Sequence, residues 1–327
     1  MNMKYIIIGI ILFIFSSFNV KAQPQNKDIM MVYIGGSYQN YPGINQQRKA
    51  CYWVNGYMEK LDGVAVQSLT TYKGRVYATG IYRQQGDKKT FCYWIDGMPY
   101  ALPNCTSVNR IQVYNDNVYV SGYVNTEESG FWINGVRQNM FTDGLISDFK
   151  IINNKIYATG AYKTGEIFNA CYWIDGKRFD LNNSQNYIGY GIEMVNNQIY
   201  IGAWGTVNNP NTSCYWINGI QKKNIVDNKY TIINEGFVIH NGNVIMLGEE
   251  NYWVNGIKQN YKVIGFKGSV YTYVNGIIYI AGTYTGLGEN EVCYWEEAER
   301  HKIFGLNGEG KYFILTSIHI APFSLPE

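Results

Sequence analysis

Hydrophobic and polar residues alternate along this chain in short segments that are separated by turn residues. Residues 68–72, for example, alternate up to Lys73 and Gly74, and residues 76–80 then begin a second such segment. Asn, Asp and Gly tolerate the positive φ angles of two-residue hairpin turns, so the pattern predicts antiparallel strands joined by tight turns. Similar joins recur at residues 115–117, 153–154, 196–197, 241–242 and 275–276.

A tryptophan motif repeats along the chain at nearly constant intervals. Seven times an aromatic residue is followed by Trp, and six of these copies continue with Val or Ile, Asn or Asp, and Gly. The tryptophans are Trp53, Trp94, Trp132, Trp173, Trp216, Trp253 and Trp295, with spacings of 41, 38, 41, 43, 37 and 42 residues. Such a period is typical of a β-propeller, in which each repeat forms one small sheet, or blade. Each repeat contains four predicted strands, so the sequence predicts an all-β, seven-bladed propeller with four-stranded blades.

The first and last repeats are each incomplete, and they complement each other. Residues 30–36 match the second strand of a repeat without a first strand before them, whereas residues 313–320 match a first strand without a second strand after them. If these two segments pair, the ring closes and the sheet edges are covered. We therefore expect residues 30–327 to form a single propeller domain closed by the C-terminal strand.

Residues 1–22 have the features of a cleavable secretory signal. Lys4 precedes an apolar run at residues 5–15, and Ala22 lies directly before the expected cleavage site. The run is shorter than the roughly 20 residues of a spanning helix, which disfavours the alternative of a membrane anchor. We expect an exported protein, periplasmic or secreted, with a flexible lead at residues 23–29 and no membrane insertion after cleavage.

The charge balance narrows the class of partner. The chain has 27 Lys and Arg against 25 Asp and Glu, and removal of Lys4 and Lys21 with the signal leaves a formally neutral protein. A protein that binds nucleic acid needs a basic surface to neutralise phosphates, so no nucleic-acid partner is expected.

Five of the six cysteines occupy the same position of the repeat, two residues before the tryptophan: Cys51, Cys92, Cys171, Cys214 and Cys293. Stacked sheets lie about 10 Å apart, beyond the roughly 7 Å limit for bridged Cα atoms. We expect these cysteines to be buried thiols rather than disulfides. Cys105 lies outside the pattern, and a bridge to Cys92 is the alternative for that residue.

Positions that differ between repeats are candidates for function. The first strand of a propeller blade usually lines the central channel, and alignment of the repeats places six polar residues there: Arg110, Gln112, Asp148, Lys150, Glu193 and His319. Four of them come from three consecutive blades and are expected to form a charged cluster on one side of the channel. This cluster either holds the blades in register through ion pairs or faces a ligand.

A second variable position lies at the end of the second strand, two residues after the repeat glycine. Five repeats carry an aromatic residue there: Tyr38, Tyr82, Tyr162, Trp204 and Tyr284. The tight turns share one face of the propeller, so this position lies at the opposite face, with the longer loops. Aromatic rings stack on sugars and on protein side chains, which makes the five residues candidates for ligand binding; packing between blades is the alternative.

Catalytic motifs are absent from the sequence. It contains no nucleophile elbow, phosphate-binding loop or paired metal-ligand motif, and its three histidines fall at different strand positions. A lone histidine in a strand is more often structural than catalytic. The sequence therefore indicates no catalytic residue, cofactor or metal, and a lyase role for His319 with Arg110 or Lys150 rests on analogy of fold alone.

The Tyr-Trp-Ile-Asn-Gly and Val-Tyr-x-x-Gly units resemble those of exported bacterial β-propeller repeat proteins. The resemblance covers nearly the whole mature chain and implies the fold without an activity. We expect a non-catalytic propeller that binds a glycan or a protein partner through its loop face. The alternatives are a structural or assembly component of the cell envelope and a glycan-cleaving enzyme.

Overall fold

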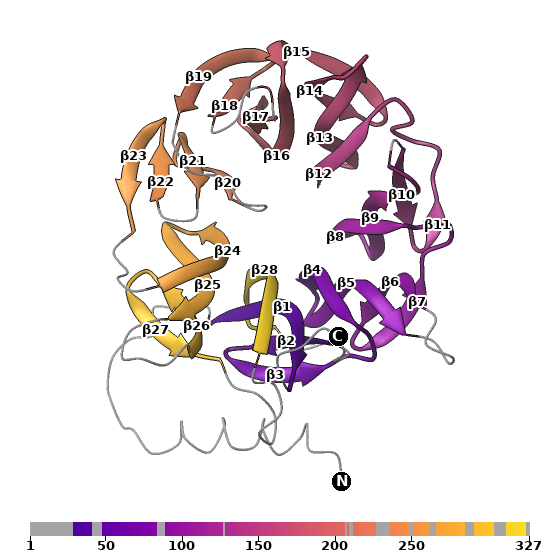
Figure 1. Ribbon diagram of the computed structural model, residues 1–327, viewed down its shortest axis with the longest axis vertical. Coiled ribbons are helices and arrows are strands. Elements are labelled where there is room, and N and C mark those ends of the chain that lie inside the picture. Colours follow the sequence, from indigo (N-terminus) through magenta and orange to yellow (C-terminus); the bar gives the residue numbers. More distant parts are fainter. Residues whose placement is uncertain are drawn as a thin grey trace.

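The described part of the chain forms a ring of seven sheets. The computed structural model describes residues 29–40, 48–83, 89–126, 128–206, 208, 212–226, 236–248, 251–261, 266–284, 291–303 and 312–324. The predicted signal and residues 23–28 of the predicted lead lie outside these ranges. Within them, seven four-stranded antiparallel sheets stand around a central axis (Figure 1). The predicted all-β, seven-bladed propeller is confirmed.

We number the blades along the chain and give each from its innermost to its outermost strand. Blade 1 contains β28 (Tyr312–Pro322), β1 (Met30–Gln39), β2 (Lys49–Val54) and β3 (Tyr57–Lys60), and blade 2 contains β4 (Ala65–Tyr72), β5 (Arg75–Arg83), β6 (Lys89–Ile95) and β7 (Met98–Ala101). Blade 3 contains β8 (Ser107–Tyr114), β9 (Asn117–Tyr123), β10 (Ser129–Ile133) and β11 (Val136–Arg137), and blade 4 contains β12 (Leu145–Ile152), β13 (Lys155–Thr164), β14 (Ile167–Ile174) and β15 (Lys177–Gln185). Blade 5 contains β16 (Tyr187–Val195), β17 (Gln198–Gly205), β18 (Thr212–Ile217) and β19 (Ile220–Val226), and blade 6 contains β20 (Phe237–His240), β21 (Asn243–Leu247), β22 (Asn251–Val254) and β23 (Ile257–Asn260). Blade 7 contains β24 (Phe266–Val274), β25 (Ile277–Tyr284), β26 (Glu291–Glu296) and β27 (Glu299–Lys302).

Blade 1 joins the two ends of the chain. The C-terminal strand β28 pairs antiparallel with β1 along its whole length, from Met30 opposite Pro322 to Gln39 opposite Tyr312. Figure 1 shows the two strands side by side at the centre of the ring's lower edge. The predicted closure by the C-terminal strand is therefore confirmed.

The repeated Asn-Gly and Asp-Gly pairs have a structural role at the turn between the third and fourth strands. In blade 1, Asn55 and Gly56 both have positive φ angles, of 49° and 86°, as a type I′ turn requires. The backbone N–H of Val32 in β1 also donates a hydrogen bond to Asn55 Oδ1 at 2.9 Å. The same bond is made at 2.8 to 2.9 Å by Asp96, Asn134, Asp175, Asn218 and Asn255. The polar turn residue therefore ties the outer hairpin to the second strand.

The repeat glycine makes room for a bulge in the innermost strand. In blade 4 the register of β12 against β13 shifts between Ile146 and Asp148. A Cβ atom on Gly160 would collide with the carbonyl oxygen of Leu145 at this place, so only glycine fits. The bulge is followed directly by Asp148, and in blade 3 an equivalent shift is followed by Arg110. The bulges thus precede the first residues that face the channel.

The hydrophobic core is divided among the interfaces between blades. All seven repeat tryptophans are buried, and each core cluster combines neighbouring blades, as when Tyr93 of blade 2 packs with Trp132 of blade 3. All six cysteines lie in the described part of the chain and are free thiols. Burial raises the pKa of the Cys105 thiol to about 12, and its Sγ donates to the carbonyl oxygen of Ser107. Among the described residues, no helix is long and apolar enough to cross a membrane.

Candidate functional site

The innermost strands enclose a central channel. It contains a cavity of about 410 Å³ with lining residues from the innermost strand of every blade. The six predicted channel residues Arg110, Gln112, Asp148, Lys150, Glu193 and His319 are all among them. The lining from the other blades includes Ser68, Thr70, Val238, Thr272 and His319. The charged pairs of the channel therefore lie on one side, in blades 3 to 5.

The first charged pair of the channel is tightly held. Arg110 Nε lies 3.0 Å from Asp148 Oδ1, across the boundary between blades 3 and 4. The other carboxylate oxygen of Asp148 accepts the backbone N–H of Ile192 from blade 5 at 3.3 Å. Asp148 is buried, so this carboxylate is satisfied by groups from the two blades that flank it.

The second charged pair joins blades 4 and 5. Lys150 Nζ lies 3.0 Å from Glu193 Oε1, and the proximity of Glu193 raises the pKa of Lys150 above its usual value. Next to it, Gln112 donates a hydrogen bond to the carbonyl oxygen of Phe149 at 2.5 Å. Each predicted cation is therefore paired with a carboxylate of the next blade, which stabilises the register of blades 3 to 5.

His319 lies on the closing strand β28, apart from these pairs. Its Nε2 is 3.2 Å from the hydroxyl of Thr71 in blade 2. Burial, followed by repulsion from Lys150, lowers the pKa of His319 to about 4. The imidazole is thus neutral at neutral pH, and its contact with Thr71 links the closing strand to the next blade.

The five predicted aromatic residues do not form an exposed ring. Tyr38 is buried, with 2 % of its surface exposed, so the expectation that its ring faces a ligand is wrong. Its side chain shares a sheet face with Ile34, which is fully buried in the same cluster, because side chains two residues apart in a strand point the same way. Both faces of a blade are covered by neighbouring blades, and Tyr38 follows that rule.

The other four aromatic residues are half-buried and pack against core clusters between blades. Trp204 stacks on the buried Tyr190 with ring centroids 5.4 Å apart. Guanidinium groups cover the rings of Tyr162 and Tyr284, with Arg178 and Arg300 at 3.9 and 4.2 Å from the ring centroids. Tyr82 packs against the cluster of blades 1 and 2.

A groove runs along the loop face between blades 3 and 4. It has two adjoining parts, of about 670 and 350 Å³, that share Thr126 and Leu145. The first part is also lined by Thr106, Ser107, Tyr123, Val124 and Asn125, and the second by Thr142, Asp143, Tyr162, Lys163 and Phe168. We call these residues the blade 3/4 groove. Among the five predicted aromatic residues, Tyr162 is the one that lines it.

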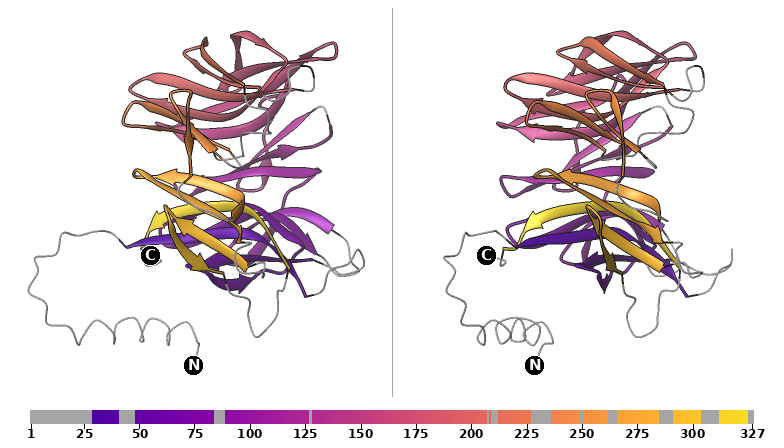
Figure 2. Two further views of the ribbon diagram at one scale, coloured as in Figure 1. Left: turned by 60° about the vertical axis from the view of Figure 1, so that its left-hand side comes forward. Right: turned by 90° about the vertical axis from the view of Figure 1, so that its left-hand side faces the viewer.

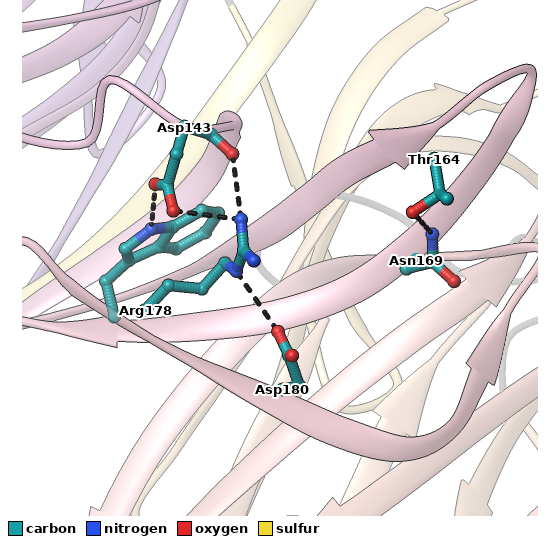
Figure 3. Close-up of polar contacts among 6 residues, drawn as sticks. Asp143, Thr164, Asn169, Arg178 and Asp180 are labelled. Carbon is teal, nitrogen blue, oxygen red and sulfur yellow. Dashed lines mark hydrogen bonds and ion pairs between the residues drawn. The ribbon is translucent and has the colours of Figure 1, made fainter.

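A polar network supports the floor of the groove. Asp143 accepts the indole N–H of Trp173 at 2.9 Å through Oδ1 and a guanidinium N–H of Arg178 at 2.9 Å through Oδ2. Figure 3 shows Arg178 between Asp143 and Asp180. The Nε atom of Arg178 donates to Asp180 Oδ1 at 3.1 Å. At the other end of β13 and β14, Asn169 donates to the hydroxyl of Thr164 at 3.2 Å (Figure 3). Since Arg178 also covers Tyr162, the network fixes the position of this ring.

Asp143 was not among the predicted site residues. It precedes Gly144 in the linker before the innermost strand of blade 4, and an Asp-Gly pair stands at the same place before blade 2, at residues 62–63. This recurring pair is the signal from which its position next to the repeat tryptophan could have been found. Within the described residues, no cluster of three or more His, Cys, Asp or Glu side chains could hold a metal ion.

Comparison with known proteins supports the propeller fold but indicates no family and no activity. No family model and no curated sequence matches the chain. The β-propeller domain of the Trilobed protease from Pyrococcus furiosus aligns over 88% of this chain and 96% of that domain, with 11% identity and a TM-score of 0.56. The WD40 β-propeller domain of Doa1 aligns over 82% of this chain and 95% of that domain, with 13% identity and a TM-score of 0.45. Streptogramin B lyase aligns over 89% of this chain and 98% of the lyase chain, with 12% identity and a TM-score of 0.44. The Pyrococcus furiosus domain is described as having an open velcro topology, whereas here β28 pairs with β1.

Proposed function

We propose that this protein is an exported, non-catalytic binding propeller that holds a glycan in the blade 3/4 groove. The observation that carries the proposal is the lining of the groove, which combines hydroxyl and amide groups with aromatic side chains. A sugar presents both hydroxyl groups and apolar C–H faces, so it matches a surface of this kind.

The charges at the groove also favour a neutral ligand. The carboxylate of Asp143 is already paired with Arg178, and the ammonium of Lys163 lies 5.0 Å from the centroid of the Phe168 ring. A charged ligand would compete with these contacts. A neutral hydroxyl group of a ligand can donate to the carboxylate of Asp143 without displacing Arg178, because each carboxylate oxygen has more than one lone pair.

The groove is also organised before any ligand arrives. Tyr162 is held by Arg178 on one side and by the core cluster of blades 3 and 4 on the other. A side chain that is already fixed loses little entropy on binding, which increases affinity for a given contact area.

The channel gives less support to the alternative of a glycan-cleaving enzyme. A lyase needs a base beside a cation that neutralises the substrate carboxylate. Arg110 and Lys150 are each engaged by a carboxylate of the protein, and the Nε2 atom of His319 contacts Thr71. Substrate binding at the channel would have to break these contacts.

A screen of the exported protein against neutral and acidic polysaccharides, followed by calorimetric titration, tests the proposal. Tyr162→Phe removes a hydroxyl group while keeping the packing, and Thr142→Val removes a second one. We expect each to weaken glycan binding by roughly 3- to 10-fold, as for a lost hydrogen bond of about 1 kcal/mol. The matched control is Tyr82→Phe, which makes the same change at the same position of blade 2, outside the groove.

Two outcomes would contradict the proposal. Equal glycan affinity of the Tyr162→Phe and Tyr82→Phe proteins would place the site elsewhere. Binding of a protein partner that is weakened by the groove substitutions, with no glycan bound in the screen, would assign the groove to protein recognition instead.

A further inference from the structure

One position of the second strand is a tyrosine in six blades and an isoleucine in the remaining one. The residue there pairs with the last residue of the third strand, and the six tyrosines are Tyr33, Tyr77, Tyr119, Tyr157, Tyr200 and Tyr279. Blade 6 has Ile245 at this position, opposite Val254. In every blade this residue packs in the core cluster shared with the next blade. The exchange at Ile245 therefore affects the interface between blades 6 and 7.

A cavity of about 280 Å³ lies in this interface. Figure 2 shows blades 6 and 7 from the outside of the ring in its right-hand view. The walls come from both blades, with Ile245, Tyr252 and Val254 on one side and Tyr273, Ile278 and Ile280 on the other. Gly276 and Glu297, two exposed turn residues, also line it, so it opens at the face of the propeller that carries the tight turns. We call this cavity the blade 6/7 pocket.

The interface between blades 5 and 6 shows what occupies the equivalent place when the tyrosine is present. Its core cluster contains Tyr200 together with Tyr215, Ile217, Val244 and Met246. The last four residues hold the same strand positions as Tyr252, Val254, Ile278 and Ile280 of the pocket. The blade 6/7 pocket therefore has the kind of walls that surround a tyrosine ring in the preceding interface, but an isoleucine replaces the ring.

Tyr261, a further ring at this interface, does not take the place of the missing one. It follows the outermost strand of blade 6 and stacks on Tyr252 with ring centroids 5.4 Å apart. Its hydroxyl donates to the carbonyl oxygen of Gly248 at 2.8 Å. Gly248 comes directly after β21, at the end of this strand that lies toward the loop face. The hydrogen bond therefore holds Tyr261 toward the loop face, and the part of the interface next to the tight turns stays open.

The pocket also offers an acceptor for a hydroxyl group. In blade 5 the hydroxyl of Tyr200 donates to Gln198 Oε1 at 2.8 Å. Asn243 holds the position of Gln198 in blade 6 and lines the pocket. Its Oδ1 accepts a hydrogen bond from Asn255 at 2.8 Å, and a carbonyl oxygen can accept a second one. Among the described lining residues, Glu297 is the one with a charge, which disfavours an anionic ligand.

We propose that the blade 6/7 pocket binds a phenol ring, supplied by a small phenolic molecule or by a tyrosine side chain of a peptide. The ring occupies the place that the repeat tyrosine fills in the other blades, against Ile245, Ile278 and Ile280, and its hydroxyl donates to Asn243. An apolar cavity of about 150 Å³ is enough to bind benzene, so the pocket has room for one ring. The proposal is independent of what the blade 3/4 groove binds.

Ligand-observed NMR titration of the exported protein with p-cresol, the analogue of a tyrosine side chain, tests the proposal. We expect p-cresol to bind, and 4-hydroxybenzoate, an anion at neutral pH, to bind more weakly. Ile245→Tyr restores the residue of the other six blades and should weaken p-cresol binding tenfold or more while the Tm is retained. N-acetyltyrosinamide distinguishes the two sources of the ring: affinity equal to that of p-cresol indicates a peptide, and lower affinity indicates a small molecule.

The matched control for Ile245→Tyr is Ile220→Tyr, which adds the same ring at an exposed position of blade 5. If Ile245→Tyr does not fold, Ile278→Phe fills the pocket from the side of blade 7 and should have the same effect.

Asn243→Ala tests the hydrogen bond to the ligand. It should weaken p-cresol binding by roughly 3- to 10-fold and leave the binding of toluene, which has no hydroxyl, unchanged. Asn117→Ala removes the equivalent contact with a turn residue in blade 3 and should change neither. The proposal is overturned if p-cresol does not bind the parent protein, if it binds the filled variant equally well, or if Asn243→Ala affects p-cresol and toluene alike.

Discussion

Acidification should destabilise this propeller through His319. Burial lowers the pKa of this imidazole to about 4 from its usual value of 6.5. Between these two pH values the unfolded chain binds a proton at this site and the folded protein does not. The free energy of unfolding therefore rises with pH over this interval, and the contribution of His319 is lost as the pH falls from 6.5 towards 4.

The size of the effect follows from the pKa difference. Each pKa unit of difference corresponds to about 1.4 kcal/mol, so the shift of His319 amounts to about 3.5 kcal/mol at most. Solvent access reduces this value, because the imidazole is half-buried and lines the cavity. Repulsion between a protonated imidazole and Lys150 is part of this shift, and Nε2–H of the protonated ring can still donate to the hydroxyl oxygen of Thr71.

Urea unfolding at pH 7.5, 5.5 and 4.5 measures the effect. Other ionisable groups of the chain also contribute to unfolding in acid, so the wild-type curve alone does not isolate His319. The His319→Gln protein retains a group that can hydrogen-bond to Thr71 and does not titrate. We expect the wild type to lose roughly 1 to 3 kcal/mol more than this variant between pH 7.5 and 4.5. Equal losses in the two proteins would refute the reasoning.

Three further predictions concern the fold. Removal of residues 312–327 takes away Leu315, Ile318 and Ile320, worth about 1.5 to 3 kcal/mol each, and should give an aggregating protein; a monomer with an unchanged Tm would contradict the closed ring. Thiol titration in denaturant without reductant should find six thiols per chain, and fewer than five would indicate a disulfide. Trp204→Ala should destabilise the protein by roughly 2 to 4 kcal/mol because the ring packs on Tyr190, and thermal unfolding close to that of wild type would show a solvent-facing ring instead.

The fold could be predicted from the sequence because every blade repeats the same local solutions. The tryptophans mark the core between blades, and the Asn-Gly and Asp-Gly pairs mark turns in which both residues have positive φ angles. The incomplete repeats at the two ends indicated the closure. These features act within one blade or between neighbours, so a periodic sequence is enough to reveal them.

The surface at the loop face could not be predicted to the same extent. The alternation of a strand places Tyr38 on the same sheet face as Ile34, but both faces of a blade are covered, so alternation does not separate buried from exposed positions. Whether Tyr162 or Tyr284 is covered depends on Arg178 and Arg300, which lie in another strand. Asp143 lies in a linker of variable length, and the Asp-Gly pair that marks its position recurs in the linker before blade 2, at residues 62–63.

The two faces of the propeller differ because the turns restrict sequence differently. At the tight-turn face, the turn residues are fixed by their φ angles and by hydrogen bonds such as that from Val32 to Asn55, which leaves the following residue as the free position. That position is apolar in five blades, although Lys177 and Glu299 are compatible with the same strand pairing. At the loop face, the linkers differ in length and sequence, and the Asp-Gly pair at residues 143–144 recurs before blade 2 at residues 62–63. The tight-turn face is therefore built alike in most blades, whereas each blade can present different groups at the loop face.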